Sequence, residues 1–151
     1  MNPSDLCLEL IELSEGFRSM PYSDAAGVGT VGYGHKILSG EDFSAGLTEA
    51  QAKTLLASDA QRAAQAVDGL VTVPLNQNQF DALVDFAFNL GANALRESTL
   101  LRLLNAGNYA AIPNEMQRWI YASDKVLPGL VTRRKREASL WCGNQNFKEI
   151  V

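Results

Sequence analysis

The chain has 151 residues, a formal net charge of -4, and a composition that is 46% apolar and 20% charged. This length and composition are those of one globular domain that can bury enough apolar surface to fold without metal ions or disulfides. They exclude collagen-like and disordered proteins, and the acidic balance argues against nucleic acid as the main partner, because phosphate binding needs a basic surface.

The N-terminus and the two cysteines indicate the cellular setting. Residues 2–6 lack the basic start and the apolar run of a secretory signal, and no segment approaches the roughly 20 apolar residues of a spanning helix. Cys7 and Cys142 fit neither a Cys-x-x-Cys redox motif nor a zinc site, and the chain has one histidine. We therefore expect a cytosolic product without membrane insertion, metal site or cofactor, whose two free thiols are buried or half-buried.

The first predicted elements are a helix and a glycine-rich hairpin. Apolar residues recur at helical spacing from Leu6 to Leu13, and Asn2 followed by a proline is a helix start, so we expect a helix over residues 3–14. Between residues 22 and 35, glycines are interspersed with strand-forming side chains. This pattern predicts a small twisted hairpin, the only sheet expected in the chain.

Helical signals dominate the remainder of the chain. Capping boxes begin at Thr48 and at Asn76, which predicts one helix that ends near Gly69 and another that ends at Gly91. Further helical pieces are predicted over residues 99–106, 110–119 and 131–141.

This order of elements predicts an α+β, mostly helical architecture in one domain that spans residues 1–151. We expect a small lobe with the glycine-rich hairpin at about residues 15–58. A larger all-helical lobe would comprise about residues 70–151 together with the helix over residues 3–14. A ligand would bind in the cleft between two such lobes.

The basic residues are unevenly distributed. The run Arg133 to Arg136 holds four of the 13 basic side chains, which leaves nine against 17 acidic side chains elsewhere. We interpret this run as a solvated basic helix face, with a dedicated anion site as the alternative.

Two carboxylates and a threonine carry the chemistry that we expect. Cleavage of a glycosidic bond needs a proton donor and an anionic group that supports the attacking nucleophile. Glu15 ends the first predicted helix, Asp24 leads into the glycine-rich turn, and Thr30 lies on the strand that returns past it. Singly, such residues are usually a solvated charge, a turn residue and a strand residue, so only their combination indicates catalysis.

The combination closely resembles the catalytic segment of the phage-type lysozymes, the T4 lysozyme family or glycoside hydrolase family 24. The matching motifs are Glu15-Gly16-Phe17-Arg18, Pro21-Tyr22-Ser23-Asp24 and Gly27-x-x-Thr30-x-Gly32-Tyr33-Gly34-His35, without a gap. Residues 73–83, 88–91 and 128–134 resemble later segments of the family, so the resemblance covers nearly the whole chain. It implies a lysozyme-like fold.

The resemblance also implies a muramidase that hydrolyses the β-1,4 bond between N-acetylmuramic acid and N-acetylglucosamine. Glu15 would be the general acid, Asp24 would support the water and the developing positive sugar, and Thr30 would position that water. Because a threonine beside Asp24 makes sense chiefly if a water is held there, we expect inversion at the anomeric carbon. A proton donor needs apolar or anionic neighbours, so we expect these around Glu15, with Arg18 mainly organising the lobe.

Other residues are given roles by the same resemblance. His35 is expected to form a stabilising ion pair with Asp59 rather than to transfer protons, and Asn89 and Tyr33 are expected to contact substrate. The stretch Lys36 to Gly46 is too short for a helix that T4 lysozyme has there. Three aromatic residues at helical positions could stack on sugars, but such residues more often pack in the core, which we expect here; they are Trp119, Tyr121 and Trp141.

The partner expected from the resemblance is the glycan strand of peptidoglycan. The protein would be a monomer made in the host bacterial cytoplasm, and would reach the periplasmic wall with the help of a holin. Two alternatives stay open: a lytic transglycosylase, for which Asp24 and Thr30 would be superfluous, and a non-catalytic glycan-binding protein that keeps the fold.

Overall fold

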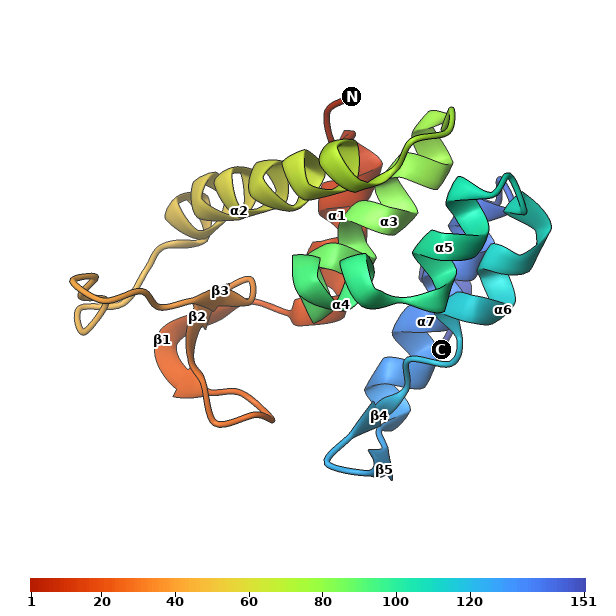
Figure 1. Cartoon of the computed structure of the whole chain (residues 1–151). Helices are drawn as coiled ribbons and strands as arrows, with labels where there is room; N and C mark the ends of the chain where they lie inside the picture. The colour runs from red at the N-terminus through yellow and green to blue at the C-terminus, as the bar shows by residue number, and fades with distance from the viewer.

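The computed structural model describes all 151 residues and confirms a mostly helical α+β architecture (Figure 1). The helices are α1 Asp5–Glu15, α2 Glu49–Leu70, α3 Gln77–Leu90, α4 Ala92–Glu97, α5 Thr99–Asn105, α6 Ile112–Met116 and α7 Pro128–Trp141. The strands are β1 Arg18–Ser23, β2 Gly29–Gly32, β3 His35–Lys36, β4 Tyr121–Ala122 and β5 Lys125–Val126, and the 3-10 turns are η1 Tyr109–Ala111 and η2 Phe147–Glu149. No helix combines the length and the apolarity that a membrane span requires.

The predicted helix starts are confirmed for α2 and α3 and wrong for α1. Both capping boxes are present, at Thr48 and at Asn76. Helix α1 begins two residues later than predicted because Ser4, not Asn2, is its N-cap: the Ser4 hydroxyl accepts a hydrogen bond from the Cys7 N–H and donates to Asp81. A long-range contact to α3 thus selects the cap.

Helix boundaries in the last third of the chain also differ from the prediction. Helix α4 was not predicted, α6 ends at Met116 rather than at residue 119, and α7 begins at Pro128 rather than at residue 131. Proline fits the first position of α7, because its missing N–H would have no partner in the helix.

Two antiparallel sheets are present where one was predicted. Strands β1, β2 and β3 form the expected glycine-rich sheet, with Thr30 on β2 lying between Tyr22 and Lys36 of its neighbours. The second sheet is the short β4–β5 hairpin. Its turn residues Ser123 and Asp124 have φ angles of 50° and 64°, the left-handed conformation of a tight hairpin turn, but without the glycine that signals such a turn in a sequence.

One hydrophobic cluster of 24 buried residues joins the helices. It includes Leu10 of α1, Leu56 of α2, Phe86 of α3 and Leu140 of α7. Figure 1 shows α3 at the centre of the molecule, with the three-stranded sheet below the start of α2 and the β4–β5 hairpin on the opposite side. The core is continuous across the helices. The division into a small lobe at about residues 15–58 and a helical lobe at about residues 70–151 stays a prediction.

The cysteines are both free. Cys7 is buried in the core, as predicted, whereas Cys142 is exposed at the end of α7. The prediction of a buried or half-buried Cys142 was therefore wrong.

Candidate active site

A cleft of about 680 Å³ separates the glycine-rich sheet from the helices and contains both predicted catalytic carboxylates. Its lining residues come from three parts of the chain: the end of α1 with the sheet, the end of α3, and the β4–β5 hairpin with the start of α7. Among them are Glu15, Tyr22, Asp24, Lys36, Phe88, Asn89, Tyr121 and Leu130.

Glu15 is the last residue of α1, which ends because Gly16 adopts a φ of 70°. Its carboxylate lies against the turn after β2, where a side chain at Gly34 would place its Cβ only 2.6 Å from the Glu15 carboxyl carbon. A side chain at position 34 would therefore displace the Glu15 carboxylate, and the φ of 71° at this position also favours glycine.

Glu15 has a cationic neighbour, whereas apolar or anionic neighbours were expected. Arg133 Nη1 donates a hydrogen bond of 2.7 Å to Glu15 Oε1. Arg18, the cation that the sequence placed nearby, instead lies 4.3 Å above the centre of the Tyr22 ring. A cation from the far end of the chain thus faces the predicted proton donor.

Asp24 occupies the turn between β1 and β2 as an ionised group. Its Oδ1 accepts hydrogen bonds from the N–H groups of Ala26, at 2.9 Å, and Val28, at 2.8 Å, while Oδ2 pairs with Lys36 Nζ. The hydrogen bond from Lys36, followed by the one from the Val28 N–H, lowers the pKa of Asp24 below its ordinary value. This carboxylate can therefore serve as a fixed negative charge in the cleft.

The structure does not bring Thr30 and Tyr33 into the lining of the cleft. Thr30 is 1% exposed and its hydroxyl donates a 2.8 Å hydrogen bond to the Val28 carbonyl. The Tyr33 ring packs on Phe17, and its hydroxyl donates to Glu49 at 2.8 Å. Burial, reinforced by Glu49, raises the pKa of Tyr33 to about 12. We therefore replace the predicted substrate contact of Tyr33 with a packing role.

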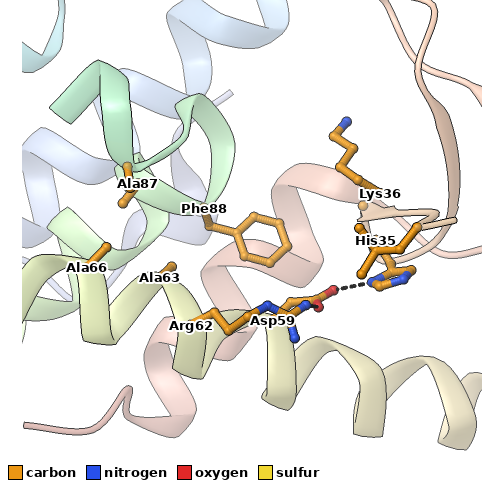
Figure 2. A pocket seen from close by; sticks show the side chains of 11 residues that line it. His35, Lys36, Asp59, Arg62, Ala63, Ala66, Ala87 and Phe88 are labelled. Carbon is orange, nitrogen blue, oxygen red and sulfur yellow. Dashed lines mark hydrogen bonds and ion pairs between the residues drawn. The ribbon is translucent and has the colours of Figure 1, made fainter. Parts of the chain in front are cut away.

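His35 lies beside a second, smaller pocket of about 290 Å³ and faces Asp59 (Figure 2). His35 Nδ1 is 2.7 Å from Asp59 Oδ2, the predicted partner, and Nε2 is 2.9 Å from Glu41 Oε1. Sequence reasoning missed Glu41, because it lies in the stretch where the resemblance to T4 lysozyme lapses. With both ring nitrogens bound, His35 ties β3 to α2 and to the following loop.

The run Arg133 to Arg136 is not the solvated face that the sequence suggested. Arg133 and Arg134 are buried, Arg136 is half-buried and donates to the Ile150 carbonyl, and only Lys135 is exposed. Their position on α7, which packs against α3, explains the error, because α7 turns the first two arginines toward the core.

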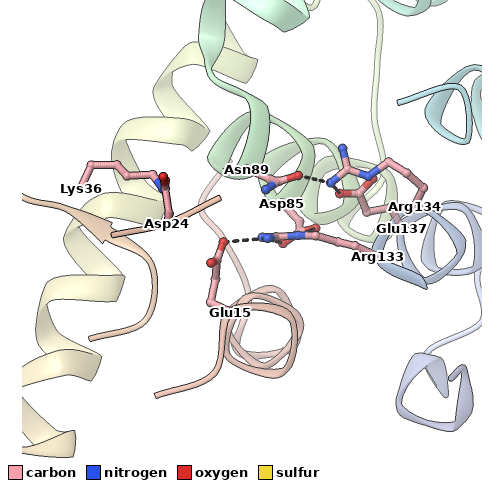
Figure 3. A network of polar contacts seen from close by, with 8 residues as sticks. All are labelled: Glu15, Asp24, Lys36, Asp85, Asn89, Arg133, Arg134 and Glu137. Carbon is pink, nitrogen blue, oxygen red and sulfur yellow. Dashed lines mark hydrogen bonds and ion pairs between the residues drawn. The ribbon is translucent and has the colours of Figure 1, made fainter. Parts of the chain in front are cut away.

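Behind Glu15 the two buried arginines form a network with acidic residues of α3 and α7 (Figure 3). Arg133 donates from Nε and Nη2 to Asp85, at 3.0 and 2.7 Å. Arg134 Nη2 lies 3.0 Å from Glu137 Oε1 and donates at 2.5 Å to Asn89 Oδ1. Asn89 thus reaches the cleft lining, as expected of a substrate-contacting residue, from the end of this network.

The pKa values of the two buried acids of the network are shifted in opposite directions. Burial opposes ionisation of Asp85, but Arg133, a hydrogen bond with Glu137 and the charge of Arg134 together outweigh burial and keep the pKa of Asp85 below its ordinary value. For Glu137, burial dominates over the attraction of Arg134 and raises its pKa well above the ordinary value. We infer an ionised Asp85 beside a protonated Glu137.

Stability should therefore depend on pH through Glu137. An acid with a raised pKa in the folded state stabilises the fold fully below its unfolded pKa, and this contribution is lost as pH rises toward the folded pKa. We expect wild type to lose about 1 kcal/mol per pH unit relative to Glu137→Gln above about pH 5. Urea unfolding of both proteins across this range tests the prediction, with Glu9→Gln as an exposed control; parallel pH profiles would contradict it.

The β4–β5 hairpin adds cleft residues that were not predicted. Tyr121 is 61% exposed and lines the cleft with Ala122 and Ser123, so the expectation that Tyr121 packs in the core was wrong. Trp119 and Trp141 do pack, on Phe86 and Tyr109 respectively. No sequence signal distinguished Tyr121, because its hairpin was not recognised.

Comparison with known proteins identifies the family. The sequence profile described as phage lysozyme matches residues 12–137. The endolysin of Bacillus phage B103 is 41% identical over 145 residues, with 93% of this chain covered, although the chain spans only 54% of that protein. The endolysin of Salmonella phage P22 is 40% identical over 137 residues, with 87% of this chain and 91% of that protein covered. The muramidase domain of SpmX from Asticaccaulis excentricus superposes with a TM-score of 0.83 at 36% identity, over 93% of this chain and 97% of that one, which confirms the lysozyme-like fold. The chain therefore belongs to the phage lysozyme family and is a phage-type lysozyme.

Proposed function

We propose that this lysozyme hydrolyses the β-1,4 bond between N-acetylmuramic acid and N-acetylglucosamine in bacterial peptidoglycan, with Glu15 as general acid and Asp24 as its anionic partner. The observation that carries the proposal is the presence of both carboxylates in one cleft, with Asp24 held ionised by Lys36 and two backbone N–H groups. The cleft also offers Asn89 and the exposed Tyr121 ring to a glycan strand.

The reaction would proceed by a single displacement. Glu15 gives its proton to the glycosidic oxygen as the bond to the anomeric carbon breaks, and the charge of Asp24 stabilises the positive sugar. A water oxygen bonds to that carbon, and its proton passes to Asp24.

Thr30 is proposed to assist the water step by a less direct route than the sequence suggested. Its hydroxyl donates to the carbonyl of Val28, and the N–H of Val28 donates to Asp24. Thr30 is therefore connected to the proposed base through one residue, and its loss would misplace Asp24 and the water that Asp24 activates.

This proposal predicts an inverting enzyme that is sensitive at position 30. The first product should be the α anomer, and Thr30→Val should lower kcat about tenfold or more while changing KM little, because geometry is lost and no charge is removed. Early-time proton NMR of a muropeptide oligomer digest measures the anomer, and Thr30→Ser is the control that keeps the hydroxyl. Initial accumulation of the β anomer, or full turnover by Thr30→Val, would refute the assignment.

The identity of the new chain ends tests the reaction itself. Mass spectrometry of purified peptidoglycan after digestion should find reducing muramic acid ends. Anhydro-muramic acid ends would establish the lytic transglycosylase instead, and binding without cleavage would establish the non-catalytic protein.

The cellular route is proposed on the analogy with the named endolysins. We propose that a monomer made in the host cytoplasm acts on the periplasmic wall after release that depends on a holin. Expression with and without a holin, followed by culture turbidity, tests this dependence.

A further inference from the structure

Arg133 is shared between two carboxylates that bind it unequally. Two of its N–H groups form a fork on Asp85, and a single N–H reaches Glu15 at 2.7 Å. Asp85 is fully buried, whereas the Glu15 side chain is 18% exposed. The paired geometry and the dry surroundings make the contact with Asp85 the stronger of the two.

The proposed reaction requires Glu15 to carry a proton although Arg133 contacts it. A general acid must hold a proton, yet an unshielded guanidinium in hydrogen-bond contact favours the ionised carboxylate. Burial alone would lower the pKa of Arg133, but Asp85 raises it and contributes more to this rise than Glu15 does. Most of the guanidinium charge is thus balanced on the side away from the cleft.

We infer that Asp85 is a positioning residue for Glu15: by neutralising Arg133 from behind, it lets the same guanidinium orient Glu15 without holding it ionised. The inference rests on the proposed role of Glu15 as the acid. It assigns a function in the reaction to a residue that never touches the cleft, since Asp85 is fully buried on α3.

The other charged groups that face Glu15 are engaged elsewhere. On the sheet side, Lys36 of β3 pairs with Asp24, and Arg18 of β1 lies over the ring of Tyr22. Tyr22 itself faces Glu15, and this carboxylate contributes to the raised pKa of Tyr22, although burial contributes most. On the helical side, Arg134 is bound by Glu137 and Asn89. Arg133 is the only cation that hydrogen-bonds to Glu15. Whether Arg133 is neutralised therefore decides how strongly positive the surroundings of Glu15 are.

Replacement of Asp85 by its uncharged isostere tests the inference. In Asp85→Asn the guanidinium loses its compensating charge, so Glu15 should lose its proton about one pH unit lower than in wild type. The alkaline limb of the kcat/KM profile against pH should move by the same amount. Carbon-13 NMR of the glutamate side-chain carboxyls reports the titration of Glu15 directly, and its signal is assigned by its absence in Glu15→Gln.

Glu137→Gln is the matched control. Glu137 is as deeply buried as Asp85 and belongs to the same network, but its salt bridge is to Arg134, and the amide of Gln can still donate the hydrogen bond that Glu137 shares with Asp85. Because it already carries a proton, its replacement removes no charge, and the titration of Glu15 should stay within about 0.3 pH unit of wild type. A structural disturbance of the network would move both variants alike, and equal shifts in the two would overturn the inference.

A double variant keeps the test decisive if Asp85→Asn folds poorly. Asp85→Asn with Arg133→Gln replaces the buried ion pair by two uncharged amides that can still hydrogen-bond to each other. Glu15 should then release its proton at a higher pH than in wild type, since the cation is gone. An unmoved titration in both the single and the double variant would overturn the inference. If the NMR titration moves in Asp85→Asn while the activity profile stays in place, Glu15 is not the acid, and the proposed function fails rather than the electrostatic link.

Discussion

Glu15→Gln is expected to lower kcat on purified peptidoglycan by at least about 100-fold while leaving the fold intact. The amide has the shape of the acid and can still accept the hydrogen bond from Arg133, but it has no proton to give to the leaving oxygen, and general acid catalysis supplies an acceleration of this size. Release of soluble muropeptides measures the activity, and thermal unfolding measures the fold.

The control is Glu12→Gln, on the same helix one turn earlier. Glu12 is half-buried like Glu15 but is not among the residues that line the cleft. We expect this variant to keep nearly full activity. Substantial wall lysis by Glu15→Gln, or equal losses in the two variants, would remove Glu15 from the role of acid.

The catalytic segment could be predicted because its geometry is local. Glu15 and Asp24 are nine residues apart, and a helix end followed by a tight hairpin suffices to bring both to one cleft. The capping boxes of α2 and α3 are equally local, since their hydrogen bonds join residues three positions apart. Short-range signals of this kind do not depend on the packing of the rest of the molecule.

The partners of Glu15 could not be predicted because they lie far along the chain. Arg133 is 118 residues from Glu15 and 48 from Asp85, and a run of four basic residues usually indicates a surface. One signal was available: Asp81 and Asp85 interrupt an otherwise apolar buried stretch of α3. A charge at such a position needs a buried partner.

Side-chain direction was the second source of error. The sequence placed Thr30 and Tyr33 on the correct strand region but could not show that both are covered, since β2 has residues of its neighbours on each side and α2 against it. Tyr121 was predicted to be buried but lines the cleft, because it lies on the β4–β5 hairpin, which was not predicted. Which face of a short strand is buried depends on tertiary contacts.

The buried pair of Arg134 and Glu137 gives the largest effect that we expect on stability. Both side chains are fully buried, and Glu137→Met would leave the Arg134 cation in the interior without its partner on α7. Removal of one partner from a buried pair is strongly destabilising, and we expect a loss of about 3 kcal/mol in the free energy of unfolding. Urea unfolding at a fixed pH measures it.

Addition of Arg134→Met to Glu137→Met should restore most of this loss. The pair itself is poorly satisfied: Arg134 Nε and Nη1 have no hydrogen-bond partner, and only Nη2 lies within 3.0 Å of Glu137 Oε1. Because desolvation opposes such a pair, two apolar side chains of similar volume can replace it at little cost in stability, and they would also pack on Phe86, over which Arg134 now lies. We expect the double variant within about 1 kcal/mol of wild type. A double variant as unstable as Glu137→Met alone would show instead that the contact between the two side chains within α7 stabilises the fold by more than the cost of burying them.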